Sequence, residues 1–356
     1  MGRLSNVKPV EVKVRLEDYI HLVLGVKKVG KTTLFRDLIN KHYNGDMTKG
    51  FLAGFEKGFQ ALDGLYAAKI KNWDDWEEYV DEFVSDKKNI PYKFIAIDTI
   101  DYMVMMAKEK TMKDSKKKDG KKVTSLNDAF GGFARGKEYC INLIRASLDK
   151  LQTSDYGIFL IGHTKLKKKN TGVVLGDGQE FMQLSCNLTD DFAGVFEEMA
   201  DMITYLVLDR EADLSVEDAK QRTSKSSVSM RFRSDGEIDC GGRFTDLPAS
   251  LPYSAENYLK AFTQGVKSSI LKPVTDTQIK EMAEKQETES AEELKENPTQ
   301  KSIEDMVAEV KKEFPNLGDG AKLVLQQLIE EAEILSLDEL TEEHRDVVEK
   351  MYELVS

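Results

Sequence analysis

The stretch Gly25-Val26-Lys27-Lys28-Val29-Gly30-Lys31-Thr32-Thr33 has the spacing G-x-x-x-x-G-K-T that is typical of a phosphate-binding P-loop. A mostly apolar run, residues 20–24, precedes it, and a helical pattern of apolar residues, 34–38, follows it. In such a loop, successive backbone N–H groups point at the phosphates, and the start of the helix adds positive charge. The sequence therefore predicts that residues 25–33 bind a nucleoside triphosphate.

Individual residues of this loop have expected roles. We expect the Lys31 ammonium to reach the β and γ phosphate oxygens and the Thr32 hydroxyl to hold Mg²⁺. Gly25 and Gly30 permit the backbone angles that the loop needs. Asp98 ends an apolar run, so its carboxylate is expected to orient a water bound to the same Mg²⁺.

Apolar runs and amphipathic stretches alternate after the loop. Runs typical of strands lie at 20–24, 50–56, 92–99, 157–162 and 203–208, and helical patterns lie at 34–38, 73–84, 139–151 and 192–199. The alternation predicts an α/β fold in which a mostly parallel sheet lies between helices and ligands gather at the carboxyl ends of the strands. Lys31, Glu56, Asp98 and His163 fall at or just beyond such ends.

The pattern changes after the last of these runs. Residues 228–244 contain Asp235-Gly236 between two alternating runs, which predicts an antiparallel hairpin at the sheet edge. We expect the core to end near residue 265, followed by a flexible acidic linker or helix, 266–300, and a small helical bundle, 301–356.

Charge is unevenly distributed along the 356 residues, whose net charge is −12. Residues 271–356 carry 10 Lys and Arg against 23 Asp and Glu, whereas residues 1–270 carry 41 against 40. The acidic C-terminal module is therefore not expected to contact DNA directly. Autoinhibition of basic loops, docking to another protein, and a simple solubilising role all fit it.

Cysteine usage and hydropathy bear on the compartment. The three cysteines, Cys140, Cys186 and Cys240, lie far apart without a C-x-x-C pair, so we expect neither a zinc site nor a disulfide framework. No segment approaches the run of about 18 apolar residues that would span a bilayer. We therefore expect a cytoplasmic protein without a membrane partner.

The order of these motifs resembles that of phage-encoded RecA-like ATP-binding proteins, some of which act as single-strand annealing proteins. The matching segments are 28–33, 56–58, 97–99, 163–165 and 241–244 with Leu247-Pro248, within about residues 10–265. The resemblance implies a RecA-like P-loop core that hydrolyses ATP with Mg²⁺. It also implies DNA-stimulated action on single-stranded DNA, as a homo-oligomer, in phage recombination or replication within the host cytoplasm, by annealing or by filament formation.

The catalytic residues that follow are Lys31, Glu56, His163 and Arg243. Because Thr99 and not a glutamate follows Asp98, the base that activates water has to come from elsewhere, and Glu56 at the end of a neighbouring strand is the candidate. By the resemblance, His163 senses the γ-phosphate. We expect Arg243 to stabilise charge on that phosphate, within the chain or across a subunit interface.

The resemblance also places single-stranded DNA on the loop that follows His163. We expect residues 164–172 to form a loop with a flexible end, whose four lysines contact the DNA backbone: Lys165, Lys167, Lys168 and Lys169. A single-strand-binding protein or another replication protein is the expected partner of the acidic C-terminal module.

Two alternatives remain open at this point. One is a nucleotide-gated module that binds DNA or protein with negligible hydrolysis. The other is a small-molecule kinase in which residues 113–136 form a lid, although that segment lacks an arginine cluster to clamp a second phosphate group.

Overall fold

The computed structural model describes residues 9–120, 123–170, 180–212, 224–296 and 303–314, together with parts of 317–355. The chain divides into two compact units. The first comprises Met1–Val84 and Asn89–Ser290, and the second comprises Ser85–Lys88 and Ala291–Ser356.

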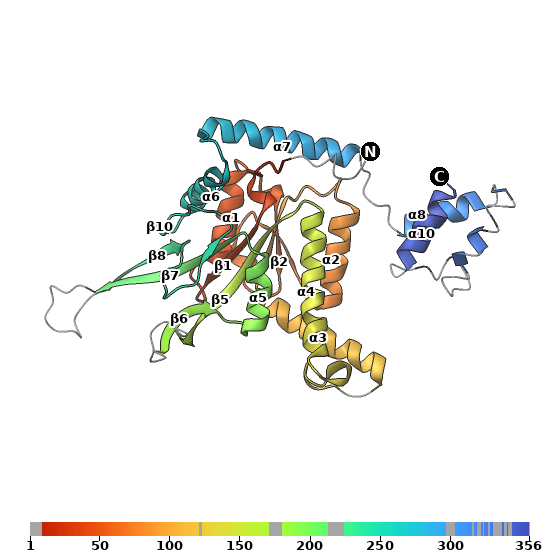
Figure 1. Cartoon of the computed structure of the whole chain (residues 1–356), viewed down its shortest axis with the longest axis horizontal. Helices are drawn as coiled ribbons and strands as arrows, with labels where there is room; N and C mark the ends of the chain where they lie inside the picture. Colours follow the sequence, from red (N-terminus) through yellow and green to blue (C-terminus); the bar gives the residue numbers. More distant parts are fainter. Residues whose placement is uncertain are drawn as a thin grey trace. The chain divides into compact units, whose positions relative to one another are not determined.

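A ten-stranded sheet forms the centre of the first unit (Figure 1). Strands β7, β1, β5, β4, β2 and β3 are parallel neighbours in this order. Their bounds are β1 Ile20–Gly25, β2 Gly50–Gly54, β3 Tyr66–Lys69, β4 Phe94–Asp98, β5 Gly157–Asn170 and β7 Met202–Ala212. The predicted α/β fold with a mostly parallel sheet between helices is confirmed.

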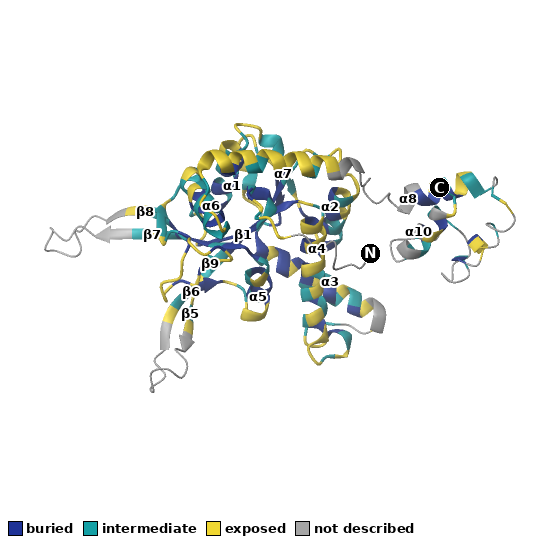
Figure 2. Ribbon diagram, turned by 45° about the horizontal axis from the view of Figure 1, so that its top comes forward, coloured by how far each residue is buried: buried dark blue, intermediate teal, exposed yellow. Residues whose placement is uncertain are grey.

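Helices cover both faces of the sheet because successive strand residues point to opposite faces. Leu22 and Leu24 join the core under one set of helices, whereas Val23 joins the core on the other face. The first set is α2 Trp73–Ser85, α3 Ile100–Asp119, α4 Arg135–Thr153 and α5 Asp190–Met199; the second is α1 Lys31–His42 and α6 Ala255–Ser269. The buried strands between these layers are the dark band of Figure 2.

The antiparallel edge of the sheet differs in its pairing from the predicted hairpin 228–244. Strand β8, Ser224–Arg231, pairs with β7 on one side and with β10, Ser250–Pro252, on the other. The segment after the Asp235-Gly236 turn contributes β9, Gly241–Gly242, which pairs with the start of β7. The two arms of the predicted hairpin thus pair with β7 and not with each other, because β7 is long enough to take both.

The lysine-rich segment after His163 is a strand up to Asn170 and not the loop that we expected. Strand β5 continues to Asn170 and pairs antiparallel with β6, Glu180–Cys186, from Thr164↔Cys186 to Asn170↔Glu180. This β5–β6 ribbon projects from the sheet, as does the β7–β8 pair (Figure 2). Residues 171 and 172 of the predicted loop lie outside the described residues.

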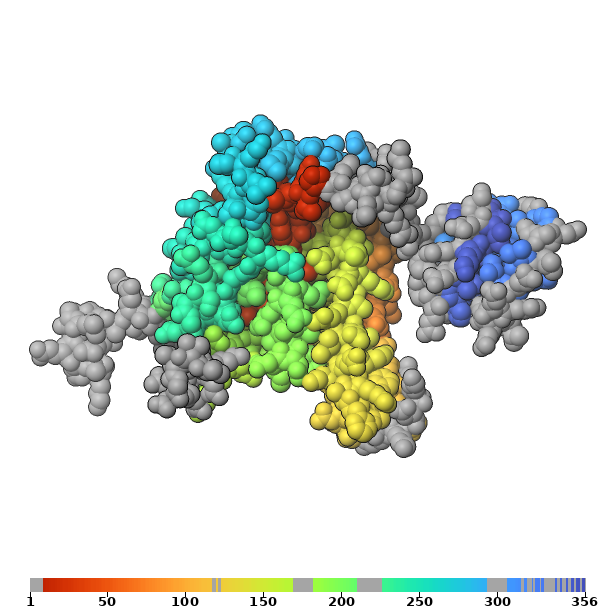
Figure 3. All heavy atoms as spheres, viewed as in Figure 1, coloured from red at the N-terminus to blue at the C-terminus, as the bar shows by residue number. Residues whose placement is uncertain are grey.

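Residues 266–300 hold the end of α6 and a further helix, α7, Asp276–Glu296. On α7, the buried Gln286 side chain accepts a hydrogen bond from Val14 N at 3.0 Å and donates one to Val12 O at 2.9 Å. The first part of α7 therefore belongs to the first unit. Figure 3 shows it in light blue at the top of this unit, whereas α3 and the start of α4, in yellow, reach the bottom.

The second unit contains α8, Ile303–Glu313, and α10, Arg345–Glu353. These helices share small apolar clusters that include Val307 with Val348, and Val310 with Met351. Among the described residues of both units, no helix is long and apolar enough to cross a membrane.

Candidate functional site

The predicted P-loop connects the end of β1 to the start of α1. Lys28 and Gly30 have positive φ angles, 64° and 103°, and this reverses the chain between strand and helix. A Cβ atom at Gly30 would be strained at this φ and would lie 2.8 Å from the Tyr253 hydroxyl. The first N–H groups of α1, which cannot have partners within the helix, open onto this loop. They form the anion-binding end of a helix.

The Lys31 side chain is folded into its own loop. Its ammonium donates hydrogen bonds to Gly25 O and Val26 O, both at 2.9 Å, and the residue is 6% exposed. Burial lowers the pKa of Lys31, and the nearby carboxylates of Asp98, Asp101 and Glu56 oppose that shift. The ammonium is therefore a nearly buried cation, held by carbonyl groups that a phosphate oxygen can replace.

Thr32 and Asp98, the two residues expected to organise Mg²⁺, contact each other directly. The Thr32 hydroxyl donates to Asp98 Oδ2 at 2.7 Å. Burial raises the pKa of Asp98, while the Thr32 hydrogen bond and the Lys31 charge lower it. A hydroxyl and a carboxylate are the oxygen donors that Mg²⁺ prefers, so this pair fits the ion.

Glu56 and His163 lie at the same edge of the sheet. Backbone bonds to Asp98 O, 2.7 Å from Phe55 N and 2.9 Å from Glu56 N, fix the turn that carries Glu56. His163 pairs with Gly25 across β5 and β1, and its Nε2 lies 4.0 Å from Glu56 Oε2. The topology thus brings together Lys31, Thr32, Asp98, Glu56 and His163, as predicted.

The predicted DNA-binding lysines occupy β5 within the ribbon. Lys165 and Lys168 are exposed, whereas Lys167 donates to Leu188 O at 2.8 Å and to Asp190 Oδ1 at 2.7 Å. Lys169 lies on the strand, but its side chain is outside the described part of the structure. Lys167 is therefore bound within its own chain, and Lys165 and Lys168 are the other two lysines of this segment whose exposure the structure describes.

Arg243 lies near the amino ends of the strands, at the opposite end from the P-loop. It follows β9, which pairs with the start of β7, and its guanidinium contacts Asp201 Oδ1 at 3.2 Å and Glu198 O at 3.2 Å. Asp201 accepts a hydrogen bond from Ile20 N at the beginning of β1. The length of β1, roughly 17 Å, therefore separates Asp201 and Arg243 from the P-loop. Of the two alternatives for Arg243, action on a nucleotide bound to its own chain does not fit this distance, and action across a subunit interface stays a prediction.

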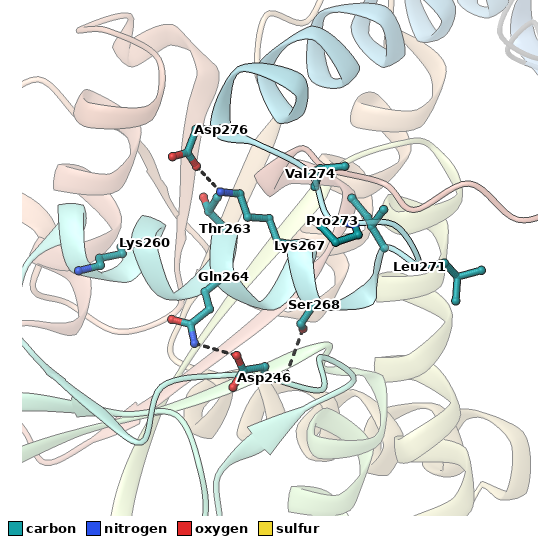
Figure 4. Close-up of a pocket in the computed structure, with 11 residues that line it drawn as sticks. Asp246, Lys260, Thr263, Gln264, Lys267, Ser268, Leu271, Pro273, Val274 and Asp276 are labelled. Carbon is teal, nitrogen blue, oxygen red and sulfur yellow. Dashed lines mark hydrogen bonds and ion pairs between the residues drawn. The ribbon is translucent and has the colours of Figure 1, made fainter.

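A pocket of about 690 Å³ lies beside α6 (Figure 4). Four of its polar side chains form two pairs: Lys267 with Asp276 at 2.6 Å, and Gln264 with Asp246 at 3.2 Å. It contains none of the residues that the sequence predicted for a site.

Three residues of the site were not anticipated. The Tyr253 hydroxyl donates to Gly30 O at 2.8 Å and so fixes the P-loop from a segment more than 200 positions away. Asp101 accepts hydrogen bonds from His163, and Asn187 donates to Asp101. Asp101 had a sequence signal, since it falls in the first helical turn after a strand that ends in a carboxylate; Tyr253 and Asn187 had none.

The contact between Thr32 and Asp98 can be tested without nucleotide or Mg²⁺. Thr32→Val keeps the shape of the side chain but leaves Asp98 Oδ2 without its donor, so we expect the free energy of unfolding to fall by about 1–3 kcal/mol. Urea unfolding at neutral pH measures the change. Thr32→Ser, which keeps the hydroxyl, is the matched control and should stay within about 1 kcal/mol of wild type. Equal losses in both variants would contradict the assigned contact.

The chain is similar to known proteins in sequence and in structure. A family model described as an AAA domain matches residues 17–235. An uncharacterised protein derived from the SPbeta prophage of Bacillus subtilis (strain 168), YorG, is 24% identical over 332 residues, which cover 92% of this chain and 85% of YorG. A KaiC-like protein of Pyrococcus horikoshii OT3 aligns with 67% of this chain and 90% of its own, at 12% identity and a TM-score of 0.35. Since the family model spans more than half of the chain, the protein belongs to the AAA-domain family.

Proposed function

We propose that this protein binds ATP with Mg²⁺, hydrolyses it, and acts on single-stranded DNA in phage recombination or replication. The observation that supports this most strongly is the meeting of Lys31, the Thr32–Asp98 pair, Glu56 and His163 at the carboxyl edge of one parallel sheet. Membership of the AAA-domain family and the similarity to a prophage-derived protein support the same reading.

Binding begins with the loop. A triphosphate takes the place of Gly25 O and Val26 O around the Lys31 ammonium. Its oxygens also accept hydrogen bonds from the N–H groups in the first turn of α1. Thr32 and Asp98 are the residues that would hold Mg²⁺. When bound, that ion neutralises charge on the phosphates during phosphoryl transfer.

Hydrolysis needs a base near the γ-phosphate. Position 99, directly after Asp98, is a threonine that is 2% exposed and cannot serve as one. Glu56 is held by Asp98 O on the adjacent strand, and its side chain is 28% exposed, so the carboxylate is accessible to a water. In the proposed reaction Glu56 accepts the proton of the attacking water, and His163 Nε2 senses the phosphate.

The β5–β6 ribbon is the proposed contact for single-stranded DNA. Its root is at His163, and it carries Lys165 and Lys168 away from the sheet. A row of cations on a projecting ribbon suits binding to a phosphate backbone without sequence preference. Oligomerisation on the DNA, with Arg243 serving a neighbouring subunit, and docking of a replication protein to the acidic C-terminal module are further parts of the proposal.

A nucleotide-gated module with negligible hydrolysis is the second candidate. Thr99 favours it, because the position next to Asp98 carries no carboxylate. In that case ATP would order the ribbon, and Glu56 would only hydrogen-bond near the phosphate.

Replacing the proposed base separates the two candidates. Glu56→Gln should lower the turnover of ATP about 10²- to 10⁴-fold, the usual contribution of a general base, while nucleotide affinity changes little. Phosphate release at saturating ATP measures the turnover. Glu78→Gln, at an exposed position of α2, is the matched control. If Glu56→Gln turns over ATP at the wild-type rate, Glu56 is not the base. If wild type and Glu56→Gln both show negligible turnover, the gated module is favoured.

The ribbon lysines can be tested through the salt dependence of binding. In the double variant Lys165→Ala, Lys168→Ala, affinity for an oligothymidylate should fall. The slope of log K against log salt should become less steep by roughly 1.4, because each contact to a single-strand phosphate contributes about 0.7. Fluorescence anisotropy at several salt concentrations measures both quantities.

The control for this experiment is the double variant Lys260→Ala, Lys272→Ala, in which two exposed lysines outside the ribbon lose the same charge. It should keep the wild-type slope. If both double variants lower the slope equally, the ribbon is not the DNA contact, and overall charge accounts for the binding.

A further inference from the structure

Asp101 holds three hydrogen bonds at the root of the β5–β6 ribbon. It lies in the first turn of α3, and its side chain is 13% exposed. Its Oδ2 accepts from His163 N at 3.0 Å and from His163 Nδ1 at 3.2 Å, and its Oδ1 accepts from Asn187 Nδ2 at 2.9 Å. Burial raises the pKa of Asp101, but the hydrogen bonds from His163 and Asn187 outweigh it and lower the pKa overall. The group is thus a carboxylate at neutral pH.

These bonds join the two arms of the ribbon. His163 directly precedes the first ribbon pair, Thr164↔Cys186, and Asn187 directly follows it. Asn187 N also donates to His163 O at 2.8 Å. Asp101, His163 and Asn187 therefore form a closed bracket of side chains and backbone around the point where the ribbon leaves the sheet.

The bracket also determines which atom of His163 faces the nucleotide site. A carboxylate can only accept, so Nδ1 carries the proton that Asp101 binds, and Nε2 is left toward Glu56 at 4.0 Å. Without Asp101, a shift of the imidazole toward a ligand would be absorbed by rotation about its own side-chain bonds. With Nδ1 and the backbone N–H of His163 on the same carboxylate oxygen, ring and ribbon root move as one body.

We propose that Asp101 and Asn187 are positioning residues that couple the nucleotide site to the lysine-bearing ribbon. This inference rests on the proposed function, since it requires a nucleotide phosphate that accepts a hydrogen bond from His163 Nε2, with the ring then donating from both of its nitrogens. A phosphate bound at His163 Nε2 shifts the imidazole ring. Because the ring is bonded to Asp101, the bracket moves with it and changes the orientation of the β5–β6 ribbon at its root. The coupling is reciprocal, so a ligand on the ribbon changes nucleotide affinity by the same factor.

Limited trypsin digestion of the intact chain tests the coupling without requiring DNA. The rate of cleavage after Lys165 and Lys168, followed by mass spectrometry, is compared with and without a saturating non-hydrolysable ATP analogue and Mg²⁺. We define the cleavage ratio as the faster of these two rates divided by the slower. For wild type we expect a ratio of about five or more, the lower end of ordinary coupling between sites. Asp101→Asn keeps the size of the side chain but loses its charge and one acceptor, so the ratio should fall to about one, whatever the affinity of this variant for the analogue.

Two further variants make the result decisive. Asp191→Asn removes a nearby carboxylate that pairs with Lys137 at 2.8 Å outside the bracket, and it should keep the wild-type ratio. Asn187→Ala, which opens one arm, should also lower the ratio and replaces Asp101→Asn if that variant does not fold.

The outcomes distinguish this proposal from the proposed function. If wild type binds the analogue but shows equal cleavage rates, or if Asp101→Asn keeps the wild-type ratio, the coupling proposal is overturned. If the analogue binds but an oligothymidylate does not, the DNA part of the proposed function fails while the cleavage ratio still decides on the bracket. If no nucleotide binds, both are overturned.

Discussion

The site depends on one nearly buried cation. The Lys31 ammonium is 6% exposed and is held by two carbonyl groups of its own loop. Such a charge is costly to bury unless its surroundings compensate it. Here three carboxylates, those of Asp98, Asp101 and Glu56, oppose the effect of burial on its pKa. The arrangement keeps a positive charge inside a loop that leads into the first N–H groups of α1, which is the environment that phosphates require.

The sheet explains why these groups are neighbours. Strands β1, β5, β4 and β2 lie side by side in that order, so the residues at their carboxyl ends meet along one edge. Gly25 is level with His163, and Asp98 is level with Gly54, two positions before Glu56. The continuation of β5 beyond His163 then makes the histidine the last residue of the core strand and the first support of a projecting ribbon. The uninterrupted strand β5 thus connects the phosphate site at His163 to the lysines of the ribbon.

Much of this could be predicted from local patterns. The P-loop, the strand ending at Asp98 and the alternation of strands and helices all have short-range signals: glycine spacing, continuous apolar runs and helical periodicity. The lysine-rich segment did not, because consecutive charges are typical of loops, and strand structure there follows from pairing with β6, for which the sequence analysis predicted no strand. The two alternatives for Arg243 stayed open for a similar reason, since its motif carries no information on which end of β7 it joins. Tyr253 and Asn187 reach the site only through tertiary contacts.

The central claim, that a triphosphate is gripped by main-chain N–H groups and one ammonium, is tested most directly by calorimetric titration of ATP, with and without Mg²⁺, into wild type and Lys31→Ala. The account predicts Mg²⁺-dependent binding to wild type and a loss of roughly tenfold or more in affinity for Lys31→Ala, since a hydrogen bond to a charged group contributes about 1.5–3 kcal/mol. A folded wild-type protein that binds no ATP, or a Lys31→Ala variant that binds it equally well, would contradict the account.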